Sequence, residues 1–254
     1  MNAAKDTAAL AGLLAEAEEI LIVTGAGVST GSGIPDYRGP KGIWNTERPV
    51  MYQDFLSSAT SRIEYWDQKL RAADFFDAAA PGAVHHACVD LEKAGKLNAL
   101  VTQNIDGLHA AAGTSSGKLV EVHGTAMEVA CLECGERTPT SPHLAEYAEN
   151  REPPICACGG LLKSATISFG QQLDTMTLYR ADQAAQEADL VIALGSTLSV
   201  YPAAEIPLIA ARRGVPYVIV NQGSTDHDGS AYLTLRIEGD VAQVFAQAVT
   251  TALL

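Results

Sequence analysis

The chain has 254 residues, of which 47% are hydrophobic, and its formal net charge is −13. This length and composition allow one large globular domain, or a large domain that carries a small insert. The acidic balance works against unaided binding to a nucleic acid backbone and favours cationic partners such as lysine-rich peptides.

The sequence also bears on localisation. No apolar run approaches the length of a membrane span, and the N-terminal segment carries Glu16, Glu18 and Glu19 rather than a basic stretch followed by an apolar one. The five cysteines are unevenly spaced and do not resemble a secreted disulfide framework. We therefore expect a cytoplasmic protein that binds neither membranes nor nucleic acid directly.

The first expected element is an apolar strand at 20–23, followed at once by a glycine-rich turn that ends in Asp36, Tyr37 and Arg38. Gly25 and Gly27 would let backbone N–H groups approach a phosphate closely. This order of residues indicates a nucleotide cradle with reactive side chains attached.

Two common motifs overlap the turn, and neither fits well. Residues 27–31 match the G-x-S-x-G nucleophile elbow of serine hydrolases, but only one plausible strand precedes Ser29, whereas that elbow lies deep in its sheet. The dinucleotide fingerprint G-x-G-x-x-G needs a third glycine where Thr30 stands. A serine hydrolase and a standard dehydrogenase are therefore disfavoured, and the remaining alternative is a flexible surface loop.

Four further apolar runs lie at 99–101, 119–122, 190–194 and 217–220, and a polar or glycine-bearing cluster follows each. Helical patterns at 8–17, 83–93, 178–187 and 203–213 lie between them. This alternation predicts an α/β fold, with a doubly wound parallel sheet and helices on both faces. Ligands bind beyond the carboxyl ends of such strands, so the polar clusters are expected to converge on one crevice.

Two stretches interrupt the alternation. Residues 40–82 are rich in aromatic residues and predict a loop that leads into helices, and residues 126–165 carry four prolines and most of the cysteines. We expect these two stretches to form a smaller lobe. The larger domain would then consist of residues 1–39, 83–125 and 166–254.

The cysteines of the second stretch form two close pairs, Cys131 with Cys134 and Cys156 with Cys158. Four thiolates at this spacing predict a zinc ribbon, in which a closed tetrahedral site leaves no position for water, so the metal would be structural. The Cys-x-Cys pair is tighter than usual, a spacing that can distort or loosen the site. A redox pair is the alternative, and Cys88 is expected in the core.

Polar residues also follow the second and third strands. Residues 103–106, Gln-Asn-Ile-Asp, suit a ribose and the positioning of a water or leaving group, although Asp106 is equally suited to capping a helix. His123 precedes Gly124 at a strand end and suits proton transfer near neutral pH, whereas a single histidine is more often structural. No such setting is evident for the other histidines, His85, His86, His109, His143 and His227.

Several segments form a pattern in chain order: Gly-Ala-Gly-Val-Ser at 25–29, Ser-Gly-Ile-Pro-Asp-Tyr-Arg at 32–38, Thr-Gln-Asn-Ile-Asp-Gly-Leu-His at 102–109, Val-His-Gly-Thr at 122–125, the four cysteines, Phe-Gly-Gln at 169–171, Gly-Ser-Thr-Leu-Ser-Val-Tyr-Pro-Ala at 195–203 and Val-Asn-Gln-Gly at 220–223. Together they resemble the sirtuins, the NAD-dependent protein lysine deacylases. The resemblance runs from about Ile20 to Val241 and is far more specific than any single motif.

The resemblance implies a Rossmann-like NAD-binding domain and a zinc lobe, with NAD and an acyl-lysine peptide entering the cleft between them. It assigns catalysis to His123, as general base, and to Asn104. The substrate peptide would pair as an added strand with Ile167, Phe169, Gly170 and Val200. The cofactor-binding residues that it implies are Gly25, Ala26, Gly27, Ser29, Thr30, Asp36, Tyr37, Arg38, Gln103, Asn104, Ile105, Asp106, Gly195, Ser196, Thr197, Asn221, Gln222 and Asp240.

The implied reaction transfers an acyl group, expected to be acetyl, from lysine to the ribose of NAD, giving nicotinamide, free lysine and O-acyl-ADP-ribose. Three positions depart from the family pattern. Gln171 stands where an acidic residue usually follows Phe-Gly, Ser168 replaces a bulkier residue, and Gln68 falls where the desuccinylase branch carries an arginine. The alternatives are a mono-ADP-ribosyltransferase and a non-catalytic sensor of NAD or ADP-ribose.

Overall fold

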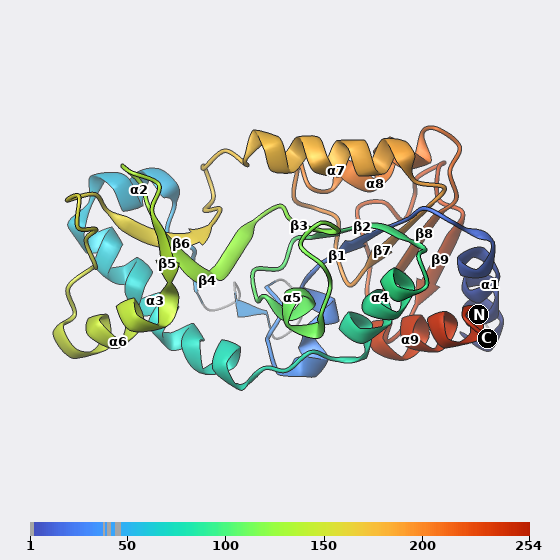
Figure 1. Ribbon diagram of the computed structural model, residues 1–254, viewed down its shortest axis with the longest axis horizontal. Helices are drawn as coiled ribbons and strands as arrows, with labels where there is room; N and C mark the ends of the chain where they lie inside the picture. The colour runs from blue at the N-terminus through green and yellow to red at the C-terminus, as the bar shows by residue number, and fades with distance from the viewer. Residues whose placement is uncertain (1–2, 38, 40–41, 44–46) are drawn as a thin grey trace.

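Two lobes lie side by side along the long axis of the molecule (Figure 1). The computed structural model describes residues 3–37, 39, 42–43 and 47–254, so the predicted cofactor residue Arg38 lies outside the described residues. Among the described residues, no helix is both long enough and apolar enough to cross a bilayer.

The large lobe contains a six-stranded, entirely parallel sheet with the strand order β3-β2-β1-β7-β8-β9. All five predicted apolar runs form strands of this sheet, while the sixth strand at its edge was not predicted. The strands are β1 (Ile20–Thr24), β2 (Leu97–Thr102), β3 (Leu119–Glu121), β7 (Leu190–Leu194), β8 (Tyr217–Asn221) and β9 (Leu235–Glu238).

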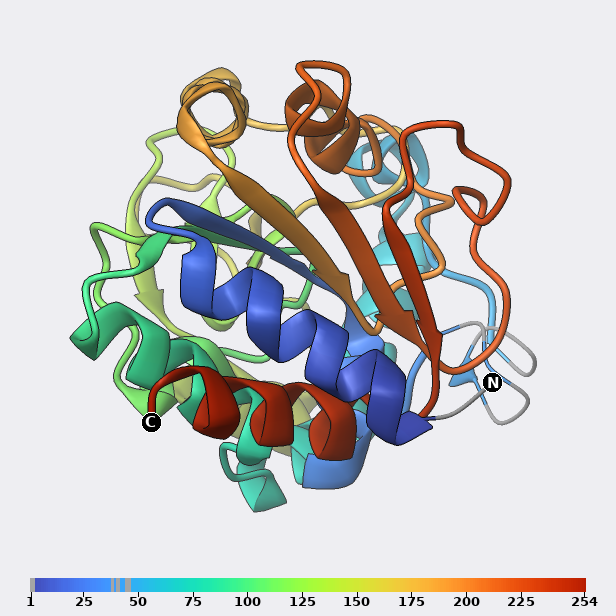
Figure 2. The same ribbon diagram turned by 90° about the vertical axis from the view of Figure 1, so that its right-hand side faces the viewer.

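Helices cover both faces of this sheet because its central strands are apolar on both sides. In β1, Ile20 and Ile22 pack into one core, whereas Leu21 and Val23 pack into the other. One face carries α1 (Ala3–Glu16), α4 (Ala83–Lys93) and α9 (Val241–Ala252), and the other carries α7 (Thr175–Glu187) and α8 (Glu205–Ala211) (Figure 2). The predicted α/β fold class is confirmed.

The strand order reverses between β1 and β7, as in a Rossmann fold, and the loops after these two strands meet there. The Gly25 N–H donates to the carbonyl of Leu194 (3.0 Å), and the Gly27 N–H donates to that of Gly195 (2.8 Å). A crevice at such a switch point is where open parallel sheets bind their ligands.

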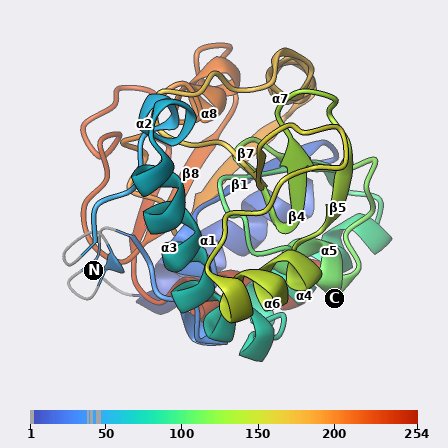
Figure 3. The same ribbon diagram turned by 90° about the vertical axis from the view of Figure 1, so that its left-hand side faces the viewer.

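The small lobe has a three-stranded antiparallel sheet, formed by β4 (Gly124–Cys131), β5 (Arg137–Pro139) and β6 (Leu162–Thr166). The helices α2 (Tyr52–Ser57), α3 (Ala59–Ala78) and α6 (Thr140–Asn150) accompany it (Figure 3). Phe55, Trp66 and Tyr147 are almost fully buried in a core of its own, all of whose members fall within 40–82 and 126–165. We propose that this core delimits the lobe close to the boundaries expected from the sequence, with the sheet extending to Gly124 and Thr166.

Candidate active site

The turn after β1 is shaped by the close approach of two backbones. It contains two short 3-10 helices, η1 (Ala26–Val28) and η2 (Thr30–Ser32). A Cβ added at Gly25 would lie 2.7 Å from the carbonyl oxygen of Gly195, and one at Gly27 would lie 2.8 Å from the Cα of Gly195. Both positions therefore require glycine, and the turn is fixed against the loop that follows β7.

Because of this close approach, substitution by alanine should lower the free energy of unfolding by different amounts at two glycines of the same turn. Gly27→Ala would force backbone against backbone, so we expect the free energy of unfolding to fall by about 1–3 kcal/mol. Gly31→Ala is the matched control, because a Cβ at Gly31 meets nothing within 4 Å. Urea denaturation of both variants measures the difference. Equal midpoints would show that the approach of Gly27 to Gly195 leaves room for a Cβ.

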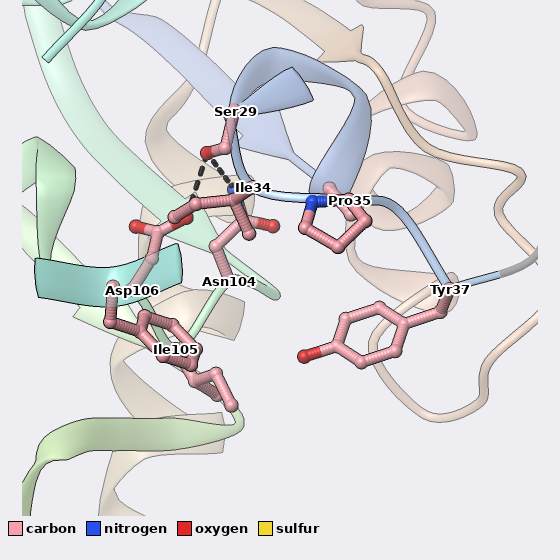
Figure 4. Close-up of a pocket in the computed structure, with 9 residues that line it drawn as sticks. Ser29, Ile34, Pro35, Tyr37, Asn104, Ile105 and Asp106 are labelled. Atoms are coloured by element: carbon pink, nitrogen blue, oxygen red, sulfur yellow. Dashed lines mark hydrogen bonds between the residues drawn. The ribbon is translucent and has the colours of Figure 1, made fainter. Parts of the chain in front are cut away.

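Three polar side chains meet beside the turn (Figure 4). The Ser29 hydroxyl donates to Asp106 Oδ2 (2.7 Å) and accepts from Asn104 Nδ2 (3.1 Å). Asp106 also accepts from the Leu108 N–H (2.9 Å) at the start of α5 (Leu108–Ala112), so its carboxylate joins the helix start to the turn. Because Ser29 gives its proton directly to a carboxylate, it lacks the serine–histidine–acid order of a hydrolase.

A small cavity adjoins these groups. Tyr37 forms part of its wall, and burial, with the negative charge of Asp106 as a lesser cause, raises the pKa of its phenol to about 12. Tyr37 therefore keeps its proton at neutral pH. Ile34 and Phe76, the latter from the last turn of α3, were not predicted as site residues. The cavity is lined by Ala26, Ser29, Ile34, Pro35, Tyr37, Phe76, Asn104, Ile105 and Asp106.

His123 lies where β3 leads into β4. Its Nδ1 lies 3.0 Å from the carbonyl oxygen of Gln103. A carbonyl can only accept, so Nδ1 carries the proton and Nε2 has the lone pair that a general base needs. The Gln103 side chain donates to Ser196 Oγ (3.0 Å), and the Ile167 N–H donates to the His123 carbonyl (2.8 Å). The loops after β2, β6 and β7 are thus joined around this histidine.

Two buried histidines, for which no functional role was predicted, lie beneath the cradle. His85 Nε2 lies 3.5 Å from Ser29 Oγ, and the rings of His85 and His109 are 4.6 Å apart. His109 Nε2 lies 3.1 Å from Thr24 Oγ1, which donates to Thr102 Oγ1 (2.8 Å). Burial lowers the pKa of His85, and it lowers that of His109 to about 3. Both rings are therefore neutral at physiological pH.

The low pKa of His109 makes the fold sensitive to acid. Above about pH 6.5 the ring is neutral in both folded and unfolded chains, whereas below it only the unfolded chain gains a proton. The free energy of unfolding should therefore fall as the pH is lowered. Between pH 6.5 and 5, His109 accounts for about 2 kcal/mol of this loss. His109→Gln keeps a donor for Thr24 and should flatten a profile of urea midpoints against pH. If the profiles of the wild type and of His109→Gln run parallel, His109 is not the source of the acid sensitivity.

The remaining predicted cofactor residues lie after β7, at the end of β8 and just beyond it, at the start of α9 and on the turn after β1. Gly195, Ser196 and Thr197 follow β7 directly, and the first two are buried beside the glycine turn. Asn221 is buried at the end of β8, while Gln222 and Asp240 are exposed. Asp36 Oδ1 accepts from the Gly39 N–H (2.8 Å), the Thr30 hydroxyl donates to the Gly27 carbonyl (3.0 Å), and Asp240 caps α9 by accepting from the Gln243 N–H (3.1 Å).

The four cysteines of the small lobe come together at one end of its sheet, and their sulfurs lie within 4.8 Å of one another. Cys131 and Cys158 are 3.5 Å apart, and Cys134 and Cys156 are 3.7 Å apart. Tetrahedral zinc with Zn–S bonds of about 2.3 Å places its ligands about 3.8 Å from each other. The donor set therefore fits one structural zinc ion, and the Cys-x-Cys spacing does not pull the ligands apart.

Comparison with known proteins identifies the family. The model of the Sir2 family matches residues 25–202. The chain belongs to the Sir2 family. It is 39% identical over 227 residues to NAD-dependent protein deacetylase 1 of Bradyrhizobium diazoefficiens, with 89% of each chain covered. The predicted resemblance to sirtuins is confirmed.

Two solved Sir2 structures share the fold over nearly the whole chain. One is a Sir2 with a p53 peptide and NAD+, with a TM-score of 0.83 and 35% sequence identity. The match covers 94% of this chain and 95% of the chain in that structure. The other, a Sir2 variant with a deacetylated p53 peptide and 3′-O-acetyl ADP ribose, has a TM-score of 0.83, is 34% identical and covers 95% of this chain and 96% of its own.

In this member of the Sir2 family, the predicted substrate residues lie on two separate segments. Ile167, Phe169 and Gly170 follow β6, and the Phe169 carbonyl accepts from the Tyr52 N–H of α2 (2.9 Å). Phe169 is partly exposed. Val200 lies on the loop after β7, and no hydrogen bond among the described residues joins it to the first segment.

Proposed function

We propose that this Sir2-family chain is an NAD-dependent protein deacetylase that works in the crevice at the sheet's switch point. The observation that carries the proposal is His123, whose Nδ1 donates to the Gln103 carbonyl, so that Nε2 is the nitrogen that can act as a base. The curated relatives named NAD-dependent protein deacetylase support it.

The proposed NAD site combines the backbone of the glycine turn with the polar residues after β2, β7 and β8. Gly25 and Gly27 hold the turn against Gly195, and their own N–H groups donate to the carbonyls of Leu194 and Gly195. Other backbone N–H groups of the turn would therefore meet a pyrophosphate, as helix and turn N-termini do in other nucleotide sites. When bound, NAD supplies the ribose that accepts the acyl group and the nicotinamide that leaves. Arg38 belongs to this assignment as a prediction from the sequence.

His123 would take a proton at Nε2 from a ribose hydroxyl, and the Gln103 carbonyl would stabilise the resulting imidazolium through Nδ1–H. Asn104 commits its Nδ2 to Ser29, so its Oδ1 remains as an acceptor that can hold a water or hydroxyl group. Asp106 would hold the Ser29 side chain and the start of α5 in place, because the Ser29 hydroxyl and the Leu108 N–H both donate to it.

The proposed peptide site is the segment after β6. Because Ile167 already bonds to His123 through its backbone, an added strand along Ile167 to Gly170 would bring an acyl-lysine next to the general base. Pairing through the peptide backbone supplies affinity with little sequence selectivity, and the net charge of −13 favours lysine-rich substrates. We retain the cytoplasmic location as a prediction.

An uncharged acyl group fits the residues of α3. Gln68 stands where the desuccinylase branch carries an arginine, and its amide donates to the Arg48 carbonyl (2.9 Å) and to Glu64 Oε1 (3.1 Å). Tyr65 is buried in the core of the small lobe. Neither side chain offers a cationic partner to a carboxylate-bearing acyl group, which supports acetyl.

The test incubates the protein with an acetyl-lysine peptide, with and without NAD whose adenine is labelled. A deacetylase releases nicotinamide and leaves the label in a small soluble product. Label on protein would favour the transferase alternative, and no release of nicotinamide would overturn both enzymes in favour of a sensor.

A further inference from the structure

A second hollow lies between the lobes. It is a groove of about 750 Å³, a volume within the usual range of ligand sites. Its walls come from α5, β3 and α7 on the large lobe and from β4, β5 and β6 on the small one. The groove shares no residue with the cavity of Figure 4. The residues that carry the argument are Thr114, Glu121, Met127, Glu128, Arg137 and Ile167.

Most of the charged groups in this groove are already engaged. Arg137 pairs with Glu128 (3.2 Å), and Asp174 accepts from the backbone and hydroxyl of Thr177 at the start of α7. Arg180 donates to three backbone carbonyls on the segment that leads into β3. These groups therefore leave little charge for a ligand.

Glu121 is different. No hydrogen bond or ion pair joins its carboxylate to another residue in the part of the chain that the structure describes. Burial raises its pKa, with the charges of Asp106 and Glu128 adding to the shift and that of Arg137 opposing it. A half-buried carboxylate between two others is a position at which a cation gains most.

Thr114, which follows α5 on the large lobe and also lines the groove, supplies an independent observation. Its side chain is 5% exposed, and its Oγ1 has no hydrogen-bond partner among the described residues. A buried hydroxyl without a partner costs about 1–3 kcal/mol, which a ligand with N–H donors would recover. Threonine oxygen and glutamate carboxylate thus present acceptors to the same groove.

Part of the groove lining is apolar. Ala110, Leu119, Val122 and Ile167 line the groove, and Met127 is 42% exposed beside it. A ligand that matches both kinds of surface carries a cationic head with N–H donors on a short aliphatic stem.

We propose that this groove binds a monovalent organic cation through Glu121 and Thr114, as a guanidinium or ammonium group on an aliphatic stem. The chemistry is shared by free alkyl cations and by arginine or lysine side chains. Glu121 is two residues before His123, and the Ile167 N–H of the groove donates to the His123 carbonyl, so the groove adjoins the segment that carries this histidine.

The test titrates n-butylguanidinium into the protein alone, by calorimetry or NMR, without NAD or peptide, so the result is independent of the proposed activity. We expect n-butylguanidinium to bind and the neutral n-butylurea not to bind. Glu121→Gln should weaken binding at least about tenfold, the size expected for one charge-assisted hydrogen bond. Lowering the pH should weaken binding to the wild type as Glu121 gains its proton.

Three controls accompany this titration. Thr114→Val should weaken binding while preserving side-chain shape, and the exposed Glu16→Gln on α1 should leave it unchanged; thermal melts confirm that each variant folds. Competition by N-acetylarginine amide would assign the site to a protein side chain, and failure to compete would assign it to a free cation. Equal binding of n-butylguanidinium by Glu121→Gln, equal binding of n-butylurea, or no binding at all would overturn the proposal.

Discussion

Replacing His123 by alanine should lower kcat by at least about 100-fold, the usual contribution of a general base, while the affinity for NAD changes little. The reason is geometric. The imidazole is positioned through Nδ1 by the Gln103 carbonyl, whereas the residues proposed to hold the dinucleotide lie on other loops. Steady-state kinetics with an acetyl-lysine peptide and a direct NAD titration separate the two effects.

The matched control is His86→Ala, since His86 is an exposed histidine of α4. It should retain wild-type kcat. A His123→Ala protein that keeps more than a tenth of wild-type kcat would move the proton transfer to another group. Equal losses of kcat and NAD affinity would instead indicate that the substitution disturbs the whole crevice.

Removing the metal should have the second large effect. Zinc binding by four thiolates contributes an apparent 10 to 16 kcal/mol, roughly the whole stability of a small domain. We therefore expect Cys134→Ala, or a strong chelator, to unfold the small lobe and abolish turnover. The β4–β6 sheet that carries the cluster also begins at Gly124 and ends at Thr166, next to His123 and Ile167. The readouts are zinc content, the melting curve and kcat.

Cys88→Ala serves as the control because Cys88 is buried in α4, away from the cluster. That variant loses some stability through a cavity but should still hold one zinc per chain. A chelated protein that retains its melting curve and full turnover would show that the cysteines are not a structural metal site.

The sequence predicts the large lobe well because its signals are local. Each central strand is a short apolar run ending in a glycine or polar cluster, and a parallel sheet brings those ends to one edge. The strand β9 escaped prediction because it lies at the sheet edge, where only Ile237 is fully buried. An edge strand needs too few apolar residues to stand out.

The site was predicted less completely, because several of its contacts join distant parts of the chain. His85 lies in a helical stretch with no motif around it, and His109 ends the 102–109 motif without an assigned role, yet they meet Ser29 and Thr24 beneath the cradle. Phe76 closes the cavity from the end of a long helix. The free carboxylate of Glu121 is likewise visible only once the small lobe packs against β3.

The central claim is that acyl removal and NAD consumption are one reaction in this crevice. The most direct measurement counts both products by mass spectrometry in the same reaction with an acetyl-lysine peptide. The account predicts one O-acetyl-ADP-ribose for each lysine deacetylated, and no deacetylation without NAD. Free acetate formed without NAD consumption, or ADP-ribose transferred to protein while the peptide stays acetylated, would contradict it.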